Sequence, residues 1–194
     1  MADREGERRM MAVDKTAPAS RLPRRLGAVA AEPRLRRYGA ERFEPAWLSL
    51  WAVAIGRETG PPMAWLLAAD NLPRAMLMAG ELPLHSADHD GVLALEGGRP
   101  PTLSQFERWW LWERLARPRR WSLRVQPATL RAVEFPLWLG YSPGRRHARL
   151  IVLSGLSGEA LGALKPAVLA GLRHRARAEA ASGPAARDDE RVPG

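Results

Sequence analysis

All eight tryptophans lie in the central part of the chain, between Trp47 and Trp138, and this distribution constrains the fold more than any other feature. Apolar residues make up 46% of the 194 residues, which is enough for a buried core in that central part. A chain of this length with one apolar centre is typical of one domain rather than two. We therefore expect a single globular domain over residues 38–180.

The two ends have a different composition. Residues 1–37 are rich in Arg, Glu, Ala and Pro, and little apolar periodicity runs through them. Leu26 and Val29 fall three apart and would fit a short helix, but no pattern there predicts what would hold it in place. We predict a disordered basic arm over residues 1–37 and a disordered tail over residues 181–194.

Several segments predict strands. Trp47 to Ile55 is apolar at both alternating sets of positions, which fits a buried strand or a buried helix, and we favour the strand. Strict alternation over Trp121–Gln126 predicts a half-buried strand. Residues 133–141 and 148–153 predict an antiparallel hairpin, and residues 83–101 a loop with a short strand at 92–95. Residues 63–78 are apolar but are interrupted by Pro73, which would break or start a helix.

Two segments predict helices. Thr102 and Gln105 form a capping-box pattern before a helix that ends ahead of Pro118, and helical spacing returns from Leu161 to Leu172. Together these elements predict an α+β fold, in which a small antiparallel sheet packs against the helices near Phe106 and Leu164. Four residues are expected in its core, namely Trp110, Trp121, Trp138 and Leu153.

The chain contains no cysteine, which excludes disulfides, thiolate zinc sites, iron–sulfur clusters and cysteine nucleophiles. The residues that remain offer weak catalytic patterns. His85, Asp88, His89 and Asp90 match no metal motif and are better read as an exposed turn. Ser154 and Ser157 flank Gly155 but fail the GxSxG spacing of a nucleophile elbow, so turn formation is the better interpretation. We expect no enzyme, no metal and no cofactor.

The formal net charge is +9, and all basic residues except Lys15 and Lys165 are arginine. This skew is typical of a high-GC genome, so part of the charge reflects codon bias. A cluster of arginines surrounds Trp121, and a second follows in the next turn and strand. If the sheet brings them to one edge, they would form a nucleic-acid-binding patch, against the alternative of a solvated turn. The candidate residues are Arg114, Arg117, Arg119, Arg120, Arg124, Arg145 and Arg146.

One stretch has a family resemblance. Pro136, Trp138 and Gly140 are similar to a "PxWxGxY" strand, with Tyr141 directly after the glycine, and residues 157–159, Ser-Gly-Glu, are similar to a following "TGE" or "TGK" turn. This strand–turn–strand pattern over 133–170 resembles a module of uncharacterised bacterial proteins that often carry zinc ribbons and are sometimes labelled helicase-like. Since the chain has no cysteine, the resemblance implies a fold element and no zinc-dependent or helicase activity.

These observations predict a noncatalytic interaction or assembly module of a bacterial cytoplasmic complex, whose protein partner the sequence does not identify. The start of the chain is charged and lacks the apolar stretch of a secretory signal, and no apolar stretch reaches the about 20 residues of a membrane span. Sequence-nonspecific nucleic-acid binding around Trp121 is the alternative.

Overall fold

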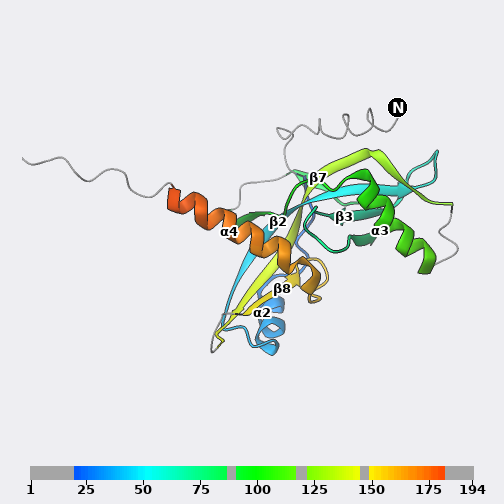
Figure 1. The fold of residues 1–194 in the computed structure, drawn as a ribbon. Helices are drawn as coiled ribbons and strands as arrows, with labels where there is room; N and C mark the ends of the chain where they lie inside the picture. Colours follow the sequence, from blue (N-terminus) through cyan, green and yellow to red (C-terminus); the bar gives the residue numbers. More distant parts are fainter. Residues whose placement is uncertain (1–19, 87–90, 117–121, 145–148, 182–194) are drawn as a thin grey trace, which may run out of the picture.

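The computed structural model describes residues 20–86, 91–116, 122–144 and 149–181, which form an α+β fold (Figure 1). In chain order the elements are β1 (Ser20–Arg21), α2 (Ala28–Arg37), β2 (Arg42–Gly56), β3 (Pro62–Ala68), β4 (Met76–Ala79), β5 (His85–Ser86), β6 (Leu93–Glu96), α3 (Leu103–Ala116), β7 (Arg124–Ser142), β8 (Arg149–Ser154), the short 3-10 helix η2 (Gly162–Leu164) and α4 (Lys165–Ala181). The strands belong to one sheet, of eight strands in the described residues.

The centre of the sheet is a long antiparallel ribbon of β2 and β7. Its register joins Arg42 to Tyr141 at one end and Gly56 to Arg124 at the other. In β2 the residues of both faces are buried from Ala52 to Gly56, which explains why the sequence there shows no polar alternation. The prediction of a strand at residues 47–55 is confirmed.

Shorter strands extend each half of the ribbon. On the β2 side, β3 and then β4 pair antiparallel along one half, while β6 pairs parallel with the other half. On the β7 side, β8 pairs antiparallel, and β1 pairs parallel further along before β5 follows. The α+β class is therefore confirmed, but the sheet is mixed rather than antiparallel, because β1 and β6 each enter beside a strand that runs in the same direction.

The predicted strand at 133–141 and residues 124–126 of the strand predicted at 121–126 belong to one strand, β7, while Ser122 and Leu123 precede it and Trp121 lies outside the described residues. The pairing of β7 with β2 contains an irregularity. Gln126 pairs with Ala54 and Arg131 pairs with Ala52, so the residues between them bulge outward opposite a single position of β2. Pro127 has no N–H to donate to the ladder, which favours a bulge at this point. The Thr129 hydroxyl accepts a hydrogen bond from the Ala54 N–H at 2.8 Å and thus replaces the missing backbone partner.

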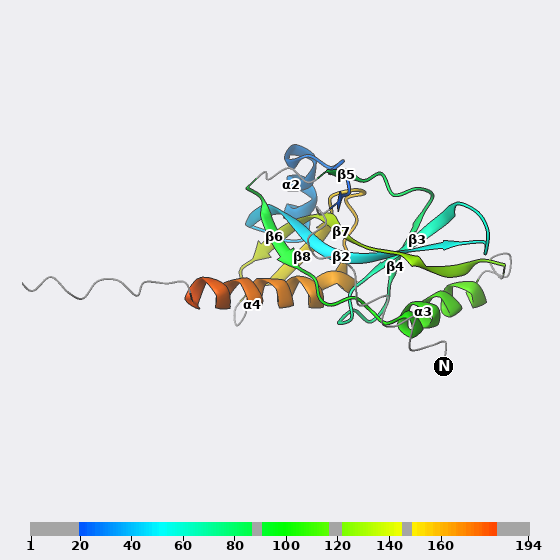
Figure 2. The ribbon, with the colours of Figure 1, turned by 90° about the horizontal axis from the view of Figure 1, so that it is seen from above.

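The helices cover both faces of the sheet. One face, which we call the α4 face, is covered by η2 and α4, and Gly171 lets α4 approach the β6 backbone at Glu96. The opposite face is covered by α3 at one end and by α2 at the other, because the strand residues that pack with these helices alternate with those of the α4 face. Figure 2 shows α2 and α4 on opposite sides of the sheet. The apolar residues that β2 contributes to the α4 face are Ala46, Leu48, Leu50, Ala52 and Ala54.

Residues 20–37 belong to the folded domain, so the prediction of a disordered arm over 1–37 is wrong for this part. Ala31 and Leu35 of α2 are fully buried and pack with Trp138, Ile151 and Leu153. The sequence did not show this because the short apolar stripe of α2 carries only a few residues and is interrupted by Pro33. Its partners lie more than 100 residues away. At the other end, α4 ends at Ala181, one residue beyond the predicted domain boundary at residue 180.

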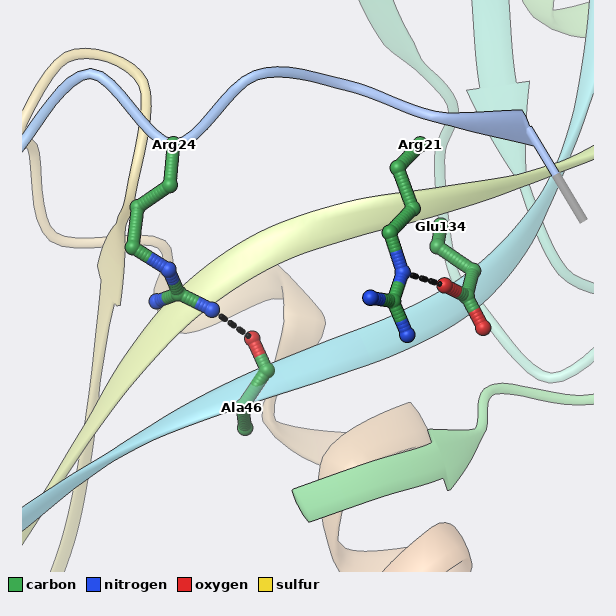
Figure 3. A network of polar contacts seen from close by, with 4 residues as sticks. All are labelled: Arg21, Arg24, Ala46 and Glu134. Atoms are coloured by element: carbon green, nitrogen blue, oxygen red, sulfur yellow. Dashed lines mark hydrogen bonds and ion pairs between the residues drawn. The ribbon is translucent and has the colours of Figure 1, made fainter. Parts of the chain in front are cut away.

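Two arginines bond residues 20–27, the start of what we call the α2 segment (residues 20–37), to the sheet (Figure 3). The guanidinium of Arg24 lies 4.6 Å from the ring centroid of Trp47 and 5.2 Å from that of Trp138. It donates hydrogen bonds to the backbone carbonyls of Leu137 at 2.6 Å and Ala46 at 3.0 Å. Arg21 forms an ion pair with Glu134 of β7. The segment therefore crosses both long strands and is bonded to each.

The "PxWxGxY" residues of β7 form the surface on which this segment packs. The Trp138 indole N–H donates to the Leu26 carbonyl at 2.9 Å. A side chain at Gly140 would meet Leu35 and Ala40 at 2.9 Å, so glycine is needed where α2 approaches. In this chain these motif residues serve packing within the domain.

Other predictions can be compared directly. The helix predicted from Thr102 is α3, and the capping box is formed, since the Thr102 N–H donates to Gln105 Oε1 at 2.8 Å and the Gln105 N–H donates to Thr102 Oγ1 at 3.3 Å. The strand predicted at 92–95 is β6, and residues 62–68 and 76–79 are strands. Trp110, Trp138 and Leu153 are buried as predicted. Trp121 lies outside the described residues.

We predict that Arg24→Ala lowers the free energy of unfolding by about 2–3 kcal/mol, because a charge-assisted hydrogen bond contributes about 1.5–3 kcal/mol and the stacked indoles add to it. Arg24→Lys should recover part of this loss, since lysine keeps the charge but not the planar fork. Urea unfolding monitored by circular dichroism measures both. A loss below about 0.5 kcal/mol for Arg24→Ala, the range of ordinary surface substitutions, would contradict the role assigned to this side chain.

Tyr141 supplies a prediction for the pH dependence of stability. Its hydroxyl donates to Glu44 Oε1 at 2.6 Å, and burial together with this carboxylate raises the pKa of Tyr141 above its usual range. The unfolded chain ionises this tyrosine near pH 10 while the folded chain keeps it neutral, so the free energy of unfolding falls as the pH rises above about 10. Tyr141→Phe should make this decline less steep, as measured by urea unfolding between pH 9 and pH 11. An unchanged slope would show that Tyr141 does not titrate differently in the two states.

Candidate interaction surface

Helix α3 has apolar residues on more than the side that faces the sheet. Phe106, Trp109 and Trp110 are buried against β2 and β3, and the Trp110 indole donates to the Leu123 carbonyl at 2.9 Å. Trp112 is 68% exposed. Successive residues of a helix are rotated by about 100°, so Trp110 and Trp112 lie on nearly opposite sides and cannot share one core.

Trp112 is accompanied by two further exposed apolar side chains, Leu111 at 40% and Leu115 at 52% exposure. Leu111 and Leu115 are four residues apart and lie on one side of the helix, next to Trp112. We call these three residues the α3 outer surface. Single exposed leucines are ordinary, but a tryptophan and two leucines grouped on one helix expose more apolar area than one residue would.

A hollow borders this surface. It has a volume of about 320 Å³ and lies between α3 and the connection from β3 to β4. The lining residues are Leu66, Pro73, Arg74, Ala75, Arg108, Trp109, Trp112 and Glu113. The Trp109 indole donates to the Pro73 carbonyl at 3.2 Å, which ties the connection to the helix. The hollow therefore combines an apolar floor with charges of both signs at its rim.

The connection leads from the hollow directly into β4, which is an edge of the sheet within the part of the chain that the structure describes. Residues 76–79 read Met-Leu-Met-Ala and contain neither a charge nor a proline. Natural sheets commonly protect an edge strand with such residues, because its unpaired N–H and C=O groups can pair with another chain. An unprotected edge thus lies beside the α3 outer surface.

Of the arginines that the sequence proposed for nucleic-acid binding, the structure describes Arg114 and Arg124. Arg114 is half-buried on α3, and Arg124 is exposed at the start of β7, where it pairs with Gly56. Arg149, which follows the proposed Arg145 and Arg146 in the sequence, lies at the opposite end of β7, where it pairs with Ser142. At about 3.3 Å per residue, the 18 residues from Arg124 to Ser142 separate the two ends by several tens of ångströms. The other proposed residues, Arg117, Arg119, Arg120, Arg145 and Arg146, lie outside the described residues.

The serine turn has the structural role that the sequence favoured. Ser154 is buried, and its hydroxyl accepts hydrogen bonds from the N–H groups of Leu156 and Ser157, each at 3.1 Å. Of the proposed metal cluster, His85 lies in β5, while Asp88, His89 and Asp90 lie outside the described residues. Across the described ranges, no group of three or more His, Asp or Glu side chains could hold a metal ion.

In comparisons with known proteins, no protein-family model, curated protein or solved structure matched the chain. None of the helices within the described part of the chain is long and apolar enough to cross a membrane. The α3 outer surface and the neighbouring β4 edge are therefore identified from geometry. Sequence reasoning missed Trp112, although the spacing of Trp110 and Trp112 already placed them on opposite sides of the helix.

Truncation of two tryptophans of α3 should change the free energy of unfolding by very different amounts. We predict that Trp110→Ala lowers the free energy of unfolding by about 3–5 kcal/mol, because a large cavity replaces a buried ring. Trp112→Ala should change it by less than about 0.5 kcal/mol, as for other surface positions. Urea unfolding of both variants tests this, and a large loss for Trp112→Ala would show that the ring is buried.

Proposed function

We propose that this protein is a noncatalytic interaction or assembly module of a bacterial cytoplasmic complex, and that it binds a protein partner through the α3 outer surface, residues Leu111, Trp112 and Leu115. The observation that carries the proposal is the 68% exposure of Trp112 on a helix whose other aromatic residues are buried.

Energetic reasons support a binding role for this side chain. Tryptophan is enriched among the few residues that dominate protein interfaces, because a large ring loses much water-exposed area at a small cost in conformational entropy. Nothing in the domain's own packing requires Trp112, since the core near α3 is filled by Phe106, Trp109 and Trp110. The exposed ring thus contributes apolar area that only a partner would bury.

The buried and half-buried polar groups described above support a noncatalytic role, because they bond within the domain. Arg24 and Trp138 bond to backbone carbonyls, and Ser154 closes a turn. These contacts lie on the face and the edge of the sheet where the α2 segment docks, and they hold the domain together. The hollow described above lies beside α3, away from these groups.

Nucleic-acid binding through the arginines near Trp121 is the competing function. Arg124 and Arg149 lie at opposite ends of β7, so a continuous patch that contains both of these arginines is not supported. A smaller patch around Arg114 and Arg124 would still predict binding that falls steeply with salt concentration. This function is an outcome of the experiment below.

The experiment is a capture of tagged protein from its native lysate, with and without nuclease, followed by mass spectrometry. Wild type is compared with Trp112→Ala and with Val29→Ala, a control at a 90% exposed position of α2. We expect a defined partner that survives nuclease and is captured by wild type and the control. Its recovery should fall at least about tenfold for Trp112→Ala, because loss of a central tryptophan costs about 2 kcal/mol or more.

Equal capture by Trp112→Ala and wild type would contradict the assigned surface. Recovery of nuclease-sensitive material alone would favour nucleic-acid binding. In that case Arg124→Ala should weaken binding of a labelled oligonucleotide and reduce its salt dependence, whereas Trp112→Ala should not.

A further inference from the structure

The edge strand β4 offers its backbone in a defined pattern. The Gly80 N–H donates to the Met63 carbonyl at 2.9 Å, and Trp65 pairs with Met78 one step further along the ladder pattern. In an antiparallel pair, alternate residues direct their backbone groups to the same neighbour. The backbone N–H and C=O groups of Met76 and Met78 therefore point toward β3, and those of Leu77 and Ala79 point away from the sheet.

This pattern is complementary to itself. If two copies pair antiparallel about a twofold axis at Met78, then Leu77 of each copy lies opposite Ala79 of the other. Residues directly opposite in this position exchange two hydrogen bonds, so the pairing forms four in all. Because the strand carries no charge and no proline, no side chain or missing N–H opposes it.

The charges that flank β4 also select a second copy in this orientation. Arg74 precedes the strand and Glu81 follows it, and both are exposed. Antiparallel pairing of two copies places Arg74 of one at the same end as Glu81 of the other, and symmetry repeats this pair at the opposite end. Parallel pairing would instead bring like charges together, which is unfavourable.

We propose that the protein forms a twofold symmetric homodimer through antiparallel pairing of its β4 strands, centred on Met78, with Arg74 and Glu81 of the two copies forming the flanking ion pairs. The two sheets then continue as one across the interface. This inference rests on the proposed function in one respect: it names a second copy as a partner in assembly, at an edge bordered by the hollow that Trp112 and Arg74 line.

Charge reversal tests the orientation. Sedimentation equilibrium of the full chain should show a dimer, and Arg74→Glu should raise its dissociation constant on the order of tenfold, because two attractive contacts become repulsive. Glu81→Arg should do the same. The double variant with both reversals restores opposite charges at each end and should recover most of the wild-type affinity. Circular dichroism establishes that each variant is folded.

Cross-linking tests the register. The chain has no cysteine, so a Met78→Cys variant carries a single thiol. Across the twofold axis the two α-carbons would be about 4.5 Å apart, as in a pair without hydrogen bonds. This separation suits a disulfide. We expect rapid formation of a covalent dimer under mild oxidation, and none for Val29→Cys, which places the thiol on α2.

A monomer at all concentrations up to about 100 µM, well above the dissociation constants of stable interfaces, would overturn the dimer. So would a dimer in which Met78→Cys forms no cross-link or the double reversal restores nothing. These results test the dimer separately from the proposed binding of a partner through Trp112. A monomer that still captures a partner through Trp112 retains that function, and a monomer that captures nothing contradicts both proposals.

Discussion

The antiparallel pairing of β2 with β7 is the interaction on which the rest of the structure depends. Every other strand is attached to this ribbon directly or through one neighbour, and helices cover it on both faces. The ribbon is buried from both sides because β2 carries apolar residues at both alternating sets of positions. A strand with two apolar faces needs a cover on each, which explains why a chain with one sheet places α4 on one side and α2 and α3 on the other.

The covers are held by different kinds of interaction. Helix α4 packs closely against β6, because Gly171 has no side chain that would meet the β6 backbone at Glu96. The α2 segment depends on polar anchoring, since Arg24 lies between Trp47 and Trp138 and bonds to a carbonyl of each long strand. This half-buried guanidinium donates to carbonyls that face the segment, while its flat surfaces contact the indoles. This is also why the residues resembling a "PxWxGxY" module carry packing in this chain.

Function is assigned to the region that the domain's own packing leaves incomplete. At the α3 end of the sheet, the helix exposes Trp112, and the adjacent strand β4 ends the sheet without the charges or prolines that usually protect an edge. The α2 end shows the opposite arrangement, because the edge of β8 is met by the chain that follows it, through the Ser154 N–H to Glu159 carbonyl and Leu161 N–H to Val152 carbonyl bonds. Within the described residues, the chain itself therefore covers the β8 edge, while α3 and β4 leave apolar side chains and backbone groups accessible to a partner.

The sequence by itself determined the local elements whose signals lie within a few residues. The capping box at Thr102 fixed the start of α3, the turn residues after Ser142 fixed the β7–β8 hairpin, and the apolar run of β2 identified a central strand. Only the tertiary structure decided that residues 20–37 are folded, because Leu35 and Arg24 gain their burial and bonds from β7 and β8, far along the chain. It also placed Arg124 and Arg149 at opposite ends of β7. Sequence and tertiary structure both determined the exposure of Trp112. Helix geometry required one of the α3 tryptophans to face away from the core, and the packing of Trp110 against Leu123 decided which one.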